Sequence, residues 1–251
     1  MAKVLDKTFG ILEAIVKQSP NPVSPTALAE ELEINRTTCS RLLKALLDDG
    51  YILKVSRQLG YVPGPKILTM SNMAGFQNDL LEKSRPVVDR CANEMKKLVL
   101  IAQLYGGKRY IIYHKNCDPC QAIRLEHLAF DDLFSTATGL LLLAYSSPAE
   151  QKRCFFEQQK IGGEFFPEFT DWEYTRKKLE NIRRQGFFEC EKEWQWIYAF
   201  PVFRRGKFCA AFGVSILKSE YTPEYDEKLR TSLQAAAQTI SNSLSPLKSI
   251  G

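Results

Sequence analysis

The segment from Asn35 to Gly50 constrains the fold more than any other part of the chain. Apolar side chains recur there at spacings of three and four residues, the period of a helix with one buried face, at Cys39, Leu42, Leu43, Leu46 and Leu47. Asn35 is a favourable N-cap, and Gly50 is a favourable residue just past a helix end. The sequence therefore predicts an amphipathic helix that buries its leucine face and ends at Gly50.

Two shorter helices are predicted ahead of this segment. The first follows an apolar stripe over residues 5–16 and ends before Pro20. The second begins at Ser24 and Pro25, an N-cap followed by a proline at the first helical position. A tight turn at residues 33–34 joins it to the leucine-rich helix, so three short helices follow one another.

A two-stranded hairpin is predicted directly after the third helix. Residues 51–55 and 59–62 are short apolar runs that flank a polar turn. Three short helices with a tight turn between the second and third, followed by a hairpin, are the pattern of a winged helix-turn-helix. We therefore expect a DNA-binding domain at residues 1–66 whose third helix enters the major groove.

The polar face of the third helix supplies the candidate DNA-binding residues. Residues 36–66 contain six basic and two acidic residues, a local charge of +4 in a chain of net charge +5. At 100° per residue, the face opposite the leucines carries basic and hydroxyl side chains. With the hairpin turn, the residues that we expect to contact DNA are Arg36, Thr37, Ser40, Arg41, Lys44 and Arg57. The alternative is that Arg41 and Lys44 only form a solvated helix face.

The rest of the chain is predicted to form a linker helix at 67–79 and a separate domain at 80–251. A helical stripe through residue 98 is expected to be kinked or restarted at Pro86. The predicted strands are 99–105, 109–114, 121–125, 196–203 and 207–217, and the predicted helices are 135–145, 148–159, 172–185 and a last one from Pro223 to Leu244. Antiparallel hairpins mixed with helices place this domain in the α+β class.

The chain resembles a known family over most of its length. INRTTCSRLLKALLDDGYI at 34–52 and YVPGP at 61–65 are similar to the winged helix-turn-helix of the IclR family of bacterial transcriptional regulators. STATG at 135–139, AFPV at 199–202 and AAFGVS at 210–215 resemble segments of that family's effector domain, in the same order. The resemblance implies a regulator with a GAF-like C-terminal domain for effector binding and oligomerisation. It also implies a homodimer or dimer of dimers on a palindromic operator, with half-sites about 34–36 Å apart or a multiple of that distance.

The same resemblance implies an effector site in the C-terminal domain. Its expected effector-binding residues are Ser135, Thr136, Thr138, Glu191, Ile197, Ala199, Gly213 and Ser215. Leu140, Trp194 and Ile197 stand where the family usually has Lys, Gly and Cys, so the cavity wall is less polar here. We therefore expect an organic acid with an apolar or aromatic body, held at the start of the helix after residue 135. The alternative is that Ser135 and Thr136 are only helix caps and Ser215 only a strand hydroxyl.

The sequence lacks the motifs of common enzyme classes. It contains no Walker A loop, no GxGxxG after a strand, no HExxH and no nucleophile elbow, so we expect neither catalytic residues nor a cofactor. The longest apolar run, 139–145, is far shorter than the ~20 residues that a bilayer core requires. The charged start of the chain does not follow the signal-peptide pattern, which makes the cytoplasm the expected location.

Three alternatives remain open on the sequence. His114, Cys117 and Cys120, with His127 beyond, could close a tetrahedral zinc shell, although a turn at 117–120 favours free thiols and we assign no metal. The chain could be an enzyme that acts on a small acid and carries an added DNA-binding domain. It could also be a dimeric DNA-binding protein without a ligand.

Overall fold

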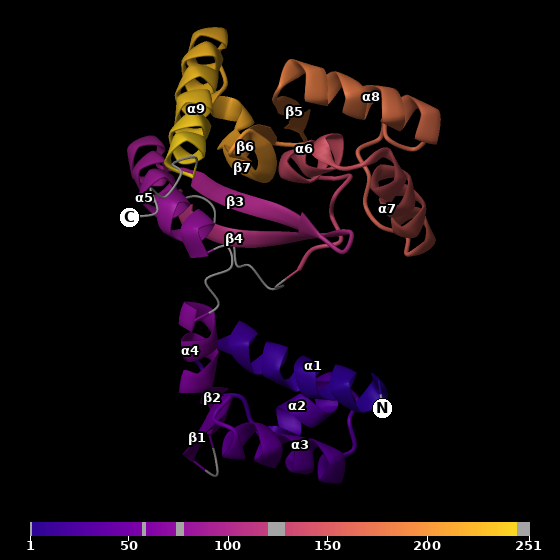
Figure 1. Cartoon of the computed structure of the whole chain (residues 1–251), viewed down its shortest axis with the longest axis vertical. Coiled ribbons are helices and arrows are strands. Elements are labelled where there is room, and N and C mark those ends of the chain that lie inside the picture. The colour runs from indigo at the N-terminus through magenta and orange to yellow at the C-terminus, as the bar shows by residue number, and fades with distance from the viewer. Residues whose placement is uncertain (1, 57–58, 74–77, 120–128, 245–251) are drawn as a thin grey trace. The chain divides into compact units, whose positions relative to one another are not determined.

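Two compact units make up the described part of the chain, one through Asn78 and the other from Asp79 onward. The computed structural model describes residues 2–56, 59–73, 78–119 and 129–244. The N-terminal unit contains α1 (Ala2–Gln18), α2 (Pro25–Glu31), α3 (Arg36–Asp48), β1 (Ile52–Ser56), β2 (Gly60–Pro63) and α4 (Pro65–Met73), as Figure 1 shows. Three helices followed by a hairpin confirm the winged helix-turn-helix.

Side-chain caps start the second and third helices of this unit. The Ser24 hydroxyl accepts the Ala27 N–H at 3.1 Å, and Oδ1 of Asn35 accepts the Thr37 N–H at 2.9 Å. Between the two helices, Glu33 adopts a positive φ of 51° in the tight turn. The three helices then bury one shared core, whose fully enclosed members include Ile11, Ile15, Leu28, Leu43 and Ile52.

The hairpin is bonded to the segment that precedes α2. β1 and β2 pair antiparallel, and Val23 and Tyr61 exchange two backbone hydrogen bonds of 2.9 Å. Gly60 permits this approach, because its φ is +100° and an added Cβ would lie 2.1 Å from the Val23 carbonyl oxygen. The hairpin is thus attached to the helix-turn-helix as a wing.

The C-terminal unit is built on a five-stranded antiparallel sheet of order β4-β3-β7-β6-β5. Its strands are β3 (Leu98–Tyr105), β4 (Lys108–Asn116), β5 (Phe188–Lys192), β6 (Gln195–Arg204) and β7 (Lys207–Leu217). Its helices are α5 (Asn78–Met95), α6 (Ala137–Tyr145), α7 (Pro148–Lys160), α8 (Trp172–Gln185) and α9 (Pro223–Ser243), with a short 3-10 turn η1 (Lys218–Glu220). The predicted α+β class is confirmed.

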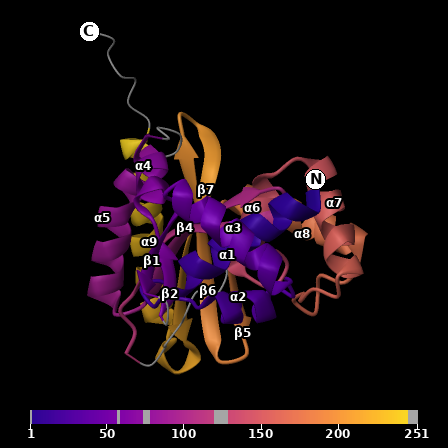
Figure 2. The ribbon, with the colours of Figure 1, turned by 90° about the horizontal axis from the view of Figure 1, so that it is seen from below.

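Helices cover both faces of this sheet. α5 and α9 lie on one face and α6, α7 and α8 on the other (Figure 2). Because side chains alternate along a strand, Tyr198 and Phe212 pack toward α5 and α9, whereas Ala199 and Ala211 lie beneath α6. Small side chains on the second face let α6 approach the sheet closely, so the start of α6 lies directly over the central strands.

Gly139 lets the first turn of α6 pack against the preceding loop. An added Cβ would lie 2.4 Å from the Leu133 carbonyl oxygen, a backbone atom that cannot rotate away. We therefore expect Gly139→Ala to destabilise the C-terminal unit by about 1–3 kcal/mol, despite the better helix propensity of Ala. Chemical unfolding followed by tryptophan fluorescence measures this loss, because all three Trp residues, at 172, 194 and 196, belong to this unit.

Gly10→Ala is the matched control for that substitution. Gly10 also lies within a helix, but its added Cβ would meet only the Leu32 side chain, at 3.6 Å. The unfolding midpoint of Gly10→Ala, detected by tryptophan fluorescence, should equal that of the wild type. An unfolding midpoint of Gly139→Ala equal to that of the wild type would contradict the close packing of α6.

The structure differs from several predicted elements. α4 covers Pro65–Met73 where the linker helix 67–79 was predicted, with residues 74–77 outside the described ranges, and the helix predicted through residue 98 ends at Met95. β5 was not predicted, because three of its five residues, Glu189, Glu191 and Lys192, are charged and it pairs only with β6. α5 does not restart at Pro86 but runs through it, where this proline is exposed and the carbonyl that it leaves without a partner can bond to water. The strand predicted at 121–125 lies outside the described residues. Within the described ranges, no helix combines the length and apolarity that crossing a bilayer requires.

Candidate functional site

The exposed face of α3 carries the predicted DNA-binding residues. Cys39, Leu42, Leu43 and Leu46 are buried in the core, which confirms the predicted apolar face of this helix. Arg36, Thr37, Ser40, Arg41 and Lys44 are all exposed. Their side chains are therefore available to base edges and phosphates, the two kinds of DNA group that such residues contact.

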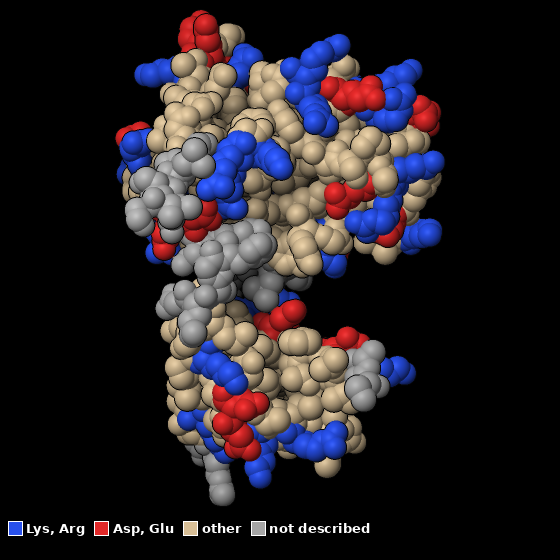
Figure 3. All heavy atoms as spheres, viewed as in Figure 1, with Lys and Arg blue, Asp and Glu red and all other residues tan. Residues whose placement is uncertain are grey.

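The charges near α3 leave its basic side chains accessible. Arg36 lies 3.9 Å from Glu30, and both side chains are exposed, so this ion pair contributes at most about 1 kcal/mol. In the wing, Lys54 is exposed and lies 6.0 Å from the centre of the Tyr61 ring. Figure 3 shows basic and acidic side chains interspersed over the surface. Arg57 lies outside the described residues.

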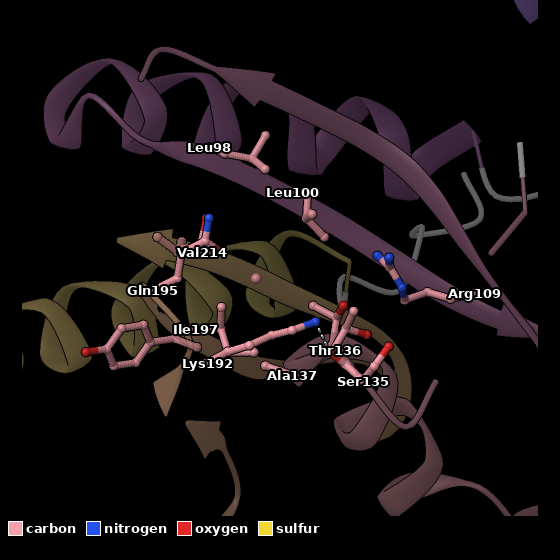
Figure 4. A pocket seen from close by; sticks show the side chains of 14 residues that line it. Leu98, Leu100, Arg109, Ser135, Thr136, Ala137, Lys192, Gln195, Ile197 and Val214 are labelled. Atoms are coloured by element: carbon pink, nitrogen blue, oxygen red, sulfur yellow. Dashed lines mark hydrogen bonds between the residues drawn. The ribbon is translucent and has the colours of Figure 1, made fainter. Parts of the chain in front are cut away.

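A small cavity opens in the C-terminal unit between the sheet and the start of α6. Its volume is about 150 Å³. Its walls come from β3, β4, β5, β6, β7 and α6, through Leu98, Leu100, Arg109, Ser135, Thr136, Ala137, Thr138, Lys192, Gln195, Ile197, Tyr198, Gly213, Val214 and Ser215. Figure 4 shows Leu98 and Leu100 on one side of this cavity and Ile197 and Lys192 on the other. Most of the effector residues predicted from the sequence are thus brought together.

The first turn of α6 forms the polar end of this cavity. The Thr136 hydroxyl accepts the Gly139 N–H at 3.1 Å and donates to the Asp132 carbonyl at 3.0 Å, so it caps the helix as the alternative interpretation proposed. Among the described residues, the N–H groups of Ala137 and Thr138 have no hydrogen-bond partner. These N–H groups are suited to an anion, because unpaired N–H groups and the helix dipole both favour negative charge.

Two adjacent strands form the floor of the cavity. Ile197 on β6 is directly opposite Ser215 on β7, and Ala199 is opposite Gly213. An added Cβ at Gly213 would lie 2.4 Å from Cγ2 of Thr138, so a glycine is needed for α6 to pack there. The pairing places Ile197 and Ser215 side by side on the face that α6 covers.

Two predicted effector residues lie outside the cavity lining. Ala199 is completely buried in the core beneath α6. Glu191 is exposed, lines a larger neighbouring hollow and forms an ion pair with Lys218. The structure therefore separates both residues from the ligand-sized space.

Two cations of the cavity were missed by the sequence analysis. Arg109 is almost fully buried; its Nε donates to Asp132 Oδ1 at 2.8 Å, and its Nη2 bonds the second carboxylate oxygen. Lys192 donates from Nζ to the Ser135 carbonyl oxygen at 3.1 Å. The sequence did contain a signal for Lys192: on a strand, Phe188, Cys190 and Lys192 point to the same face, so two apolar side chains would place the lysine on the buried face. No comparable signal marked Arg109, whose position depends on a loop 23 residues away.

The remaining titratable group of the lining is neutral. The Tyr198 hydroxyl donates to Asp226 Oδ1 at 2.7 Å, on the α9 side of the sheet. Burial and the neighbouring Asp226 carboxylate raise the pKa of Tyr198 above its ordinary value. Tyr198 therefore stays protonated and adds no charge to the cavity.

The predicted zinc alternative lies partly outside the described residues, which exclude Cys120 and His127. The Cys117 thiol donates to Asn93 Oδ1 at 3.3 Å. Burial lowers the pKa of His114 below its ordinary value. In the described ranges, no group of three or more His, Cys, Asp or Glu residues is arranged to hold a metal ion.

Each of the two units matches a model of a known protein family. A family model described as the IclR helix-turn-helix domain matches residues 4–56, and one described as the C-terminal part of the bacterial transcriptional regulator IclR matches residues 75–242. The chain belongs to the IclR family. This family of bacterial transcriptional regulators carries a DNA-binding helix-turn-helix, so the resemblance seen in the sequence is confirmed.

Relatives and solved structures agree with that assignment. The chain is 23% identical over 205 residues to the HTH-type transcriptional regulator Rv1719 of Mycobacterium tuberculosis, covering 80% of this chain and 77% of that protein. An IclR homologue of Microbacterium hydrocarbonoxydans, solved in complex with 4-hydroxybenzoate, has a TM-score of 0.78 at 15% identity and covers 96% of this chain and 98% of its own. The IclR of Thermotoga maritima has a TM-score of 0.70 at 21% identity, and the match covers 98% of this chain and 100% of that protein. Both structures share the fold of this chain.

Proposed function

We propose that this IclR-family regulator binds a palindromic operator through α3 and the wing, and that a small organic acid in the cavity beside α6 changes its operator affinity. One observation carries the effector part of the proposal: the N–H groups of Ala137 and Thr138, which have no partner among the described residues, and the Lys192 ammonium border the same cavity. A carboxylate is the common ligand group that satisfies both kinds of donor.

The size of the cavity supports a compact ligand. Its volume of about 150 Å³ equals that of an apolar cavity known to hold benzene. The Microbacterium hydrocarbonoxydans homologue was solved with 4-hydroxybenzoate, a single-ring acid. A single-ring or branched aliphatic acid therefore fits the space and the polarity of the walls.

Exposed apolar side chains support a homodimer or a dimer of dimers. Val4, Leu5 and Phe9 are exposed on α1, and Leu68 and Met70 are exposed on α4. Exposed apolar side chains on two helices of a small unit are compatible with a surface that a partner covers. A second copy of the chain as that partner would present two α3 helices to the two half-sites of a palindrome.

We infer that the regulator acts in the cytoplasm, where its operator is, and that it releases its effector unchanged. Incubating the protein with the bound acid distinguishes the three candidate functions. An acid that shifts operator affinity and is recovered intact supports the regulator. Turnover of the acid would identify an enzyme, and the absence of any saturable ligand would identify a ligand-free DNA-binding dimer.

Ser215→Ala tests the location of the effector site. The Ser215 hydroxyl lines the cavity and would hydrogen-bond a bound acid, so we expect about a 2- to 10-fold loss of affinity for benzoate, the value of one neutral hydrogen bond. Thr136→Val should also weaken binding, because it removes the cap that holds the first turn of α6. Calorimetry with benzoate and aliphatic carboxylates measures both effects. Thr136→Ser, which keeps the capping hydroxyl, is the control, and equal affinities in all variants would place the site elsewhere.

A further inference from the structure

The charges that line the cavity do not balance. Arg109 and Lys192 are the two charged side chains among its lining residues, and both are cationic. One edge of the Arg109 guanidinium, Nε and Nη2, bonds both oxygens of the Asp132 carboxylate, and the group lies 5.0 Å from the centre of the Phe130 ring. The net charge of Arg109 and Asp132 together is therefore zero.

Lys192 supplies the one positive charge left over. Its ammonium donates to a backbone carbonyl, that of Ser135, at 3.1 Å and lies 5.7 Å from the centre of the Phe166 ring. None of the ion pairs found among the described residues includes Lys192. Lys192 is half-buried, its ammonium bonds a carbonyl and lies near an aromatic ring, and no described carboxylate lies within ion-pair distance of it, so the ammonium can still bind an anion.

The strand alternation of β5 directs this ammonium to the cavity. Phe188 and Cys190 pack against the apolar cluster under α6, and Lys192 follows them on the same face of the sheet. Figure 4 shows the Lys192 side chain extended toward Ser135, beside Ile197. The lysine stem therefore runs along the apolar wall, and its charged end reaches the polar end of the cavity.

We propose that Lys192 is the specificity-determining residue of the effector site and that it selects compact acids carrying a single negative charge. The proposal deepens the function proposed above and rests on it. On binding, the ammonium exchanges its hydrogen bond to the Ser135 carbonyl for a charge-assisted bond to the carboxylate. Leu98, Leu100 and Ile197 then enclose the apolar body of the acid.

The surroundings disfavour a second negative charge. The leucine and isoleucine walls offer no partner for it, and an unpaired charge in such a space is strongly destabilised. The neighbouring hollow, which shares Ser135, Lys192 and Gln195 with the cavity, is lined by Glu164, Glu191 and Glu193. A second negative charge would therefore find hydroxyl and amide groups, such as those of Ser215 and Gln195, but among the lining residues no second cation that is not already in an ion pair, whereas a single negative charge is matched by Lys192.

Three ligands of nearly equal shape test the proposal: benzoate, benzamide and benzamidine, with charges of −1, 0 and +1. Calorimetry on the full-length wild type should rank benzoate first, about 10- to 100-fold tighter than benzamide, the value of a hydrogen bond to a charged group. Lys192→Met should bring benzoate and benzamide to nearly equal affinity. Lys192→Gln, which can still donate to the Ser135 carbonyl, should have the same effect, and benzamide binding shows that the cavity is intact in each variant.

Lys218→Met is the matched control, because Lys218 is an exposed lysine that pairs with Glu191 and does not line the cavity. It should keep the wild-type preference for benzoate. An undiminished preference in both Lys192 variants would overturn the proposal and assign the selectivity to Arg109 or to the start of α6. Failure of the wild type to bind any of the three ligands would instead contradict the proposed effector site itself.

Discussion

Arg41→Ala is expected to weaken operator binding by about 10- to 100-fold, equivalent to the ~1–3 kcal/mol of a bidentate contact between arginine and guanine. Arg41 is exposed on α3, next to the buried Leu42 and Leu43 that hold the helix in the core. The helix is therefore rigidly supported while the guanidinium is free to reach a base edge. The affinity is measured on a selected operator at about 150 mM salt, because phosphate contacts dominate at lower salt.

The loss must be specific to the operator sequence. A random duplex of equal length should lose less affinity for Arg41→Ala than the operator does, because without the matching base Arg41 can contribute at most a phosphate contact. Lys44→Ala, on the same face, should also lower operator affinity. Arg184→Ala is the control, an exposed arginine on α8 in the C-terminal unit. Wild-type affinity in both α3 variants would exclude α3 as the recognition helix.

Phe155→Ala should destabilise the C-terminal unit by about 3–5 kcal/mol, the usual cost of removing a buried ring. Phe155 is 1% exposed, and its ring packs edge-on against Phe134 at 5.6 Å and Phe165 at 5.7 Å. Phe134 immediately precedes Ser135, so the cavity left by the substitution adjoins the wall of the effector site. We therefore expect a loss of benzoate affinity together with the loss of stability.

Phe156→Ala is the control for that substitution, because the neighbouring ring on the same helix is 42% exposed. Its effect should be below about 1 kcal/mol, as for most exposed positions. Tryptophan fluorescence during chemical unfolding measures the stability of the C-terminal unit in both variants. Equal destabilisation by both would contradict the aromatic core around Phe155.

The N-terminal unit could be predicted in detail from the sequence because its signals are local. Ser24 and Asn35 cap the helices that they were expected to cap, and the leucine spacing of α3 correctly separates its buried face from its exposed one. Helix periodicity and capping depend on residues within one or two turns of each other. In this part of the chain, such short-range rules are sufficient.

The effector cavity could be predicted only in part because its walls are remote in sequence. The similarity to IclR proteins located Ser135, Ile197 and Ser215, and the pairing of β6 with β7 brings the last two together. Lys192 was missed because β5 is a short, charged edge strand, which has neither the length nor the apolar run of a typical strand. Arg109 was missed because only tertiary packing brings it to Asp132.

Selection of operator DNA from a pool of random duplexes tests the central claim most directly. The full-length wild-type chain should enrich one palindromic sequence, with half-site centres about 10–10.5 base pairs apart or a multiple of that spacing. Arg41→Ala, put through the same selection, should lose the preference at one position of each half-site. Recovery of duplexes without a shared sequence, at an affinity set by salt alone, would contradict the assignment of this chain as a sequence-specific regulator.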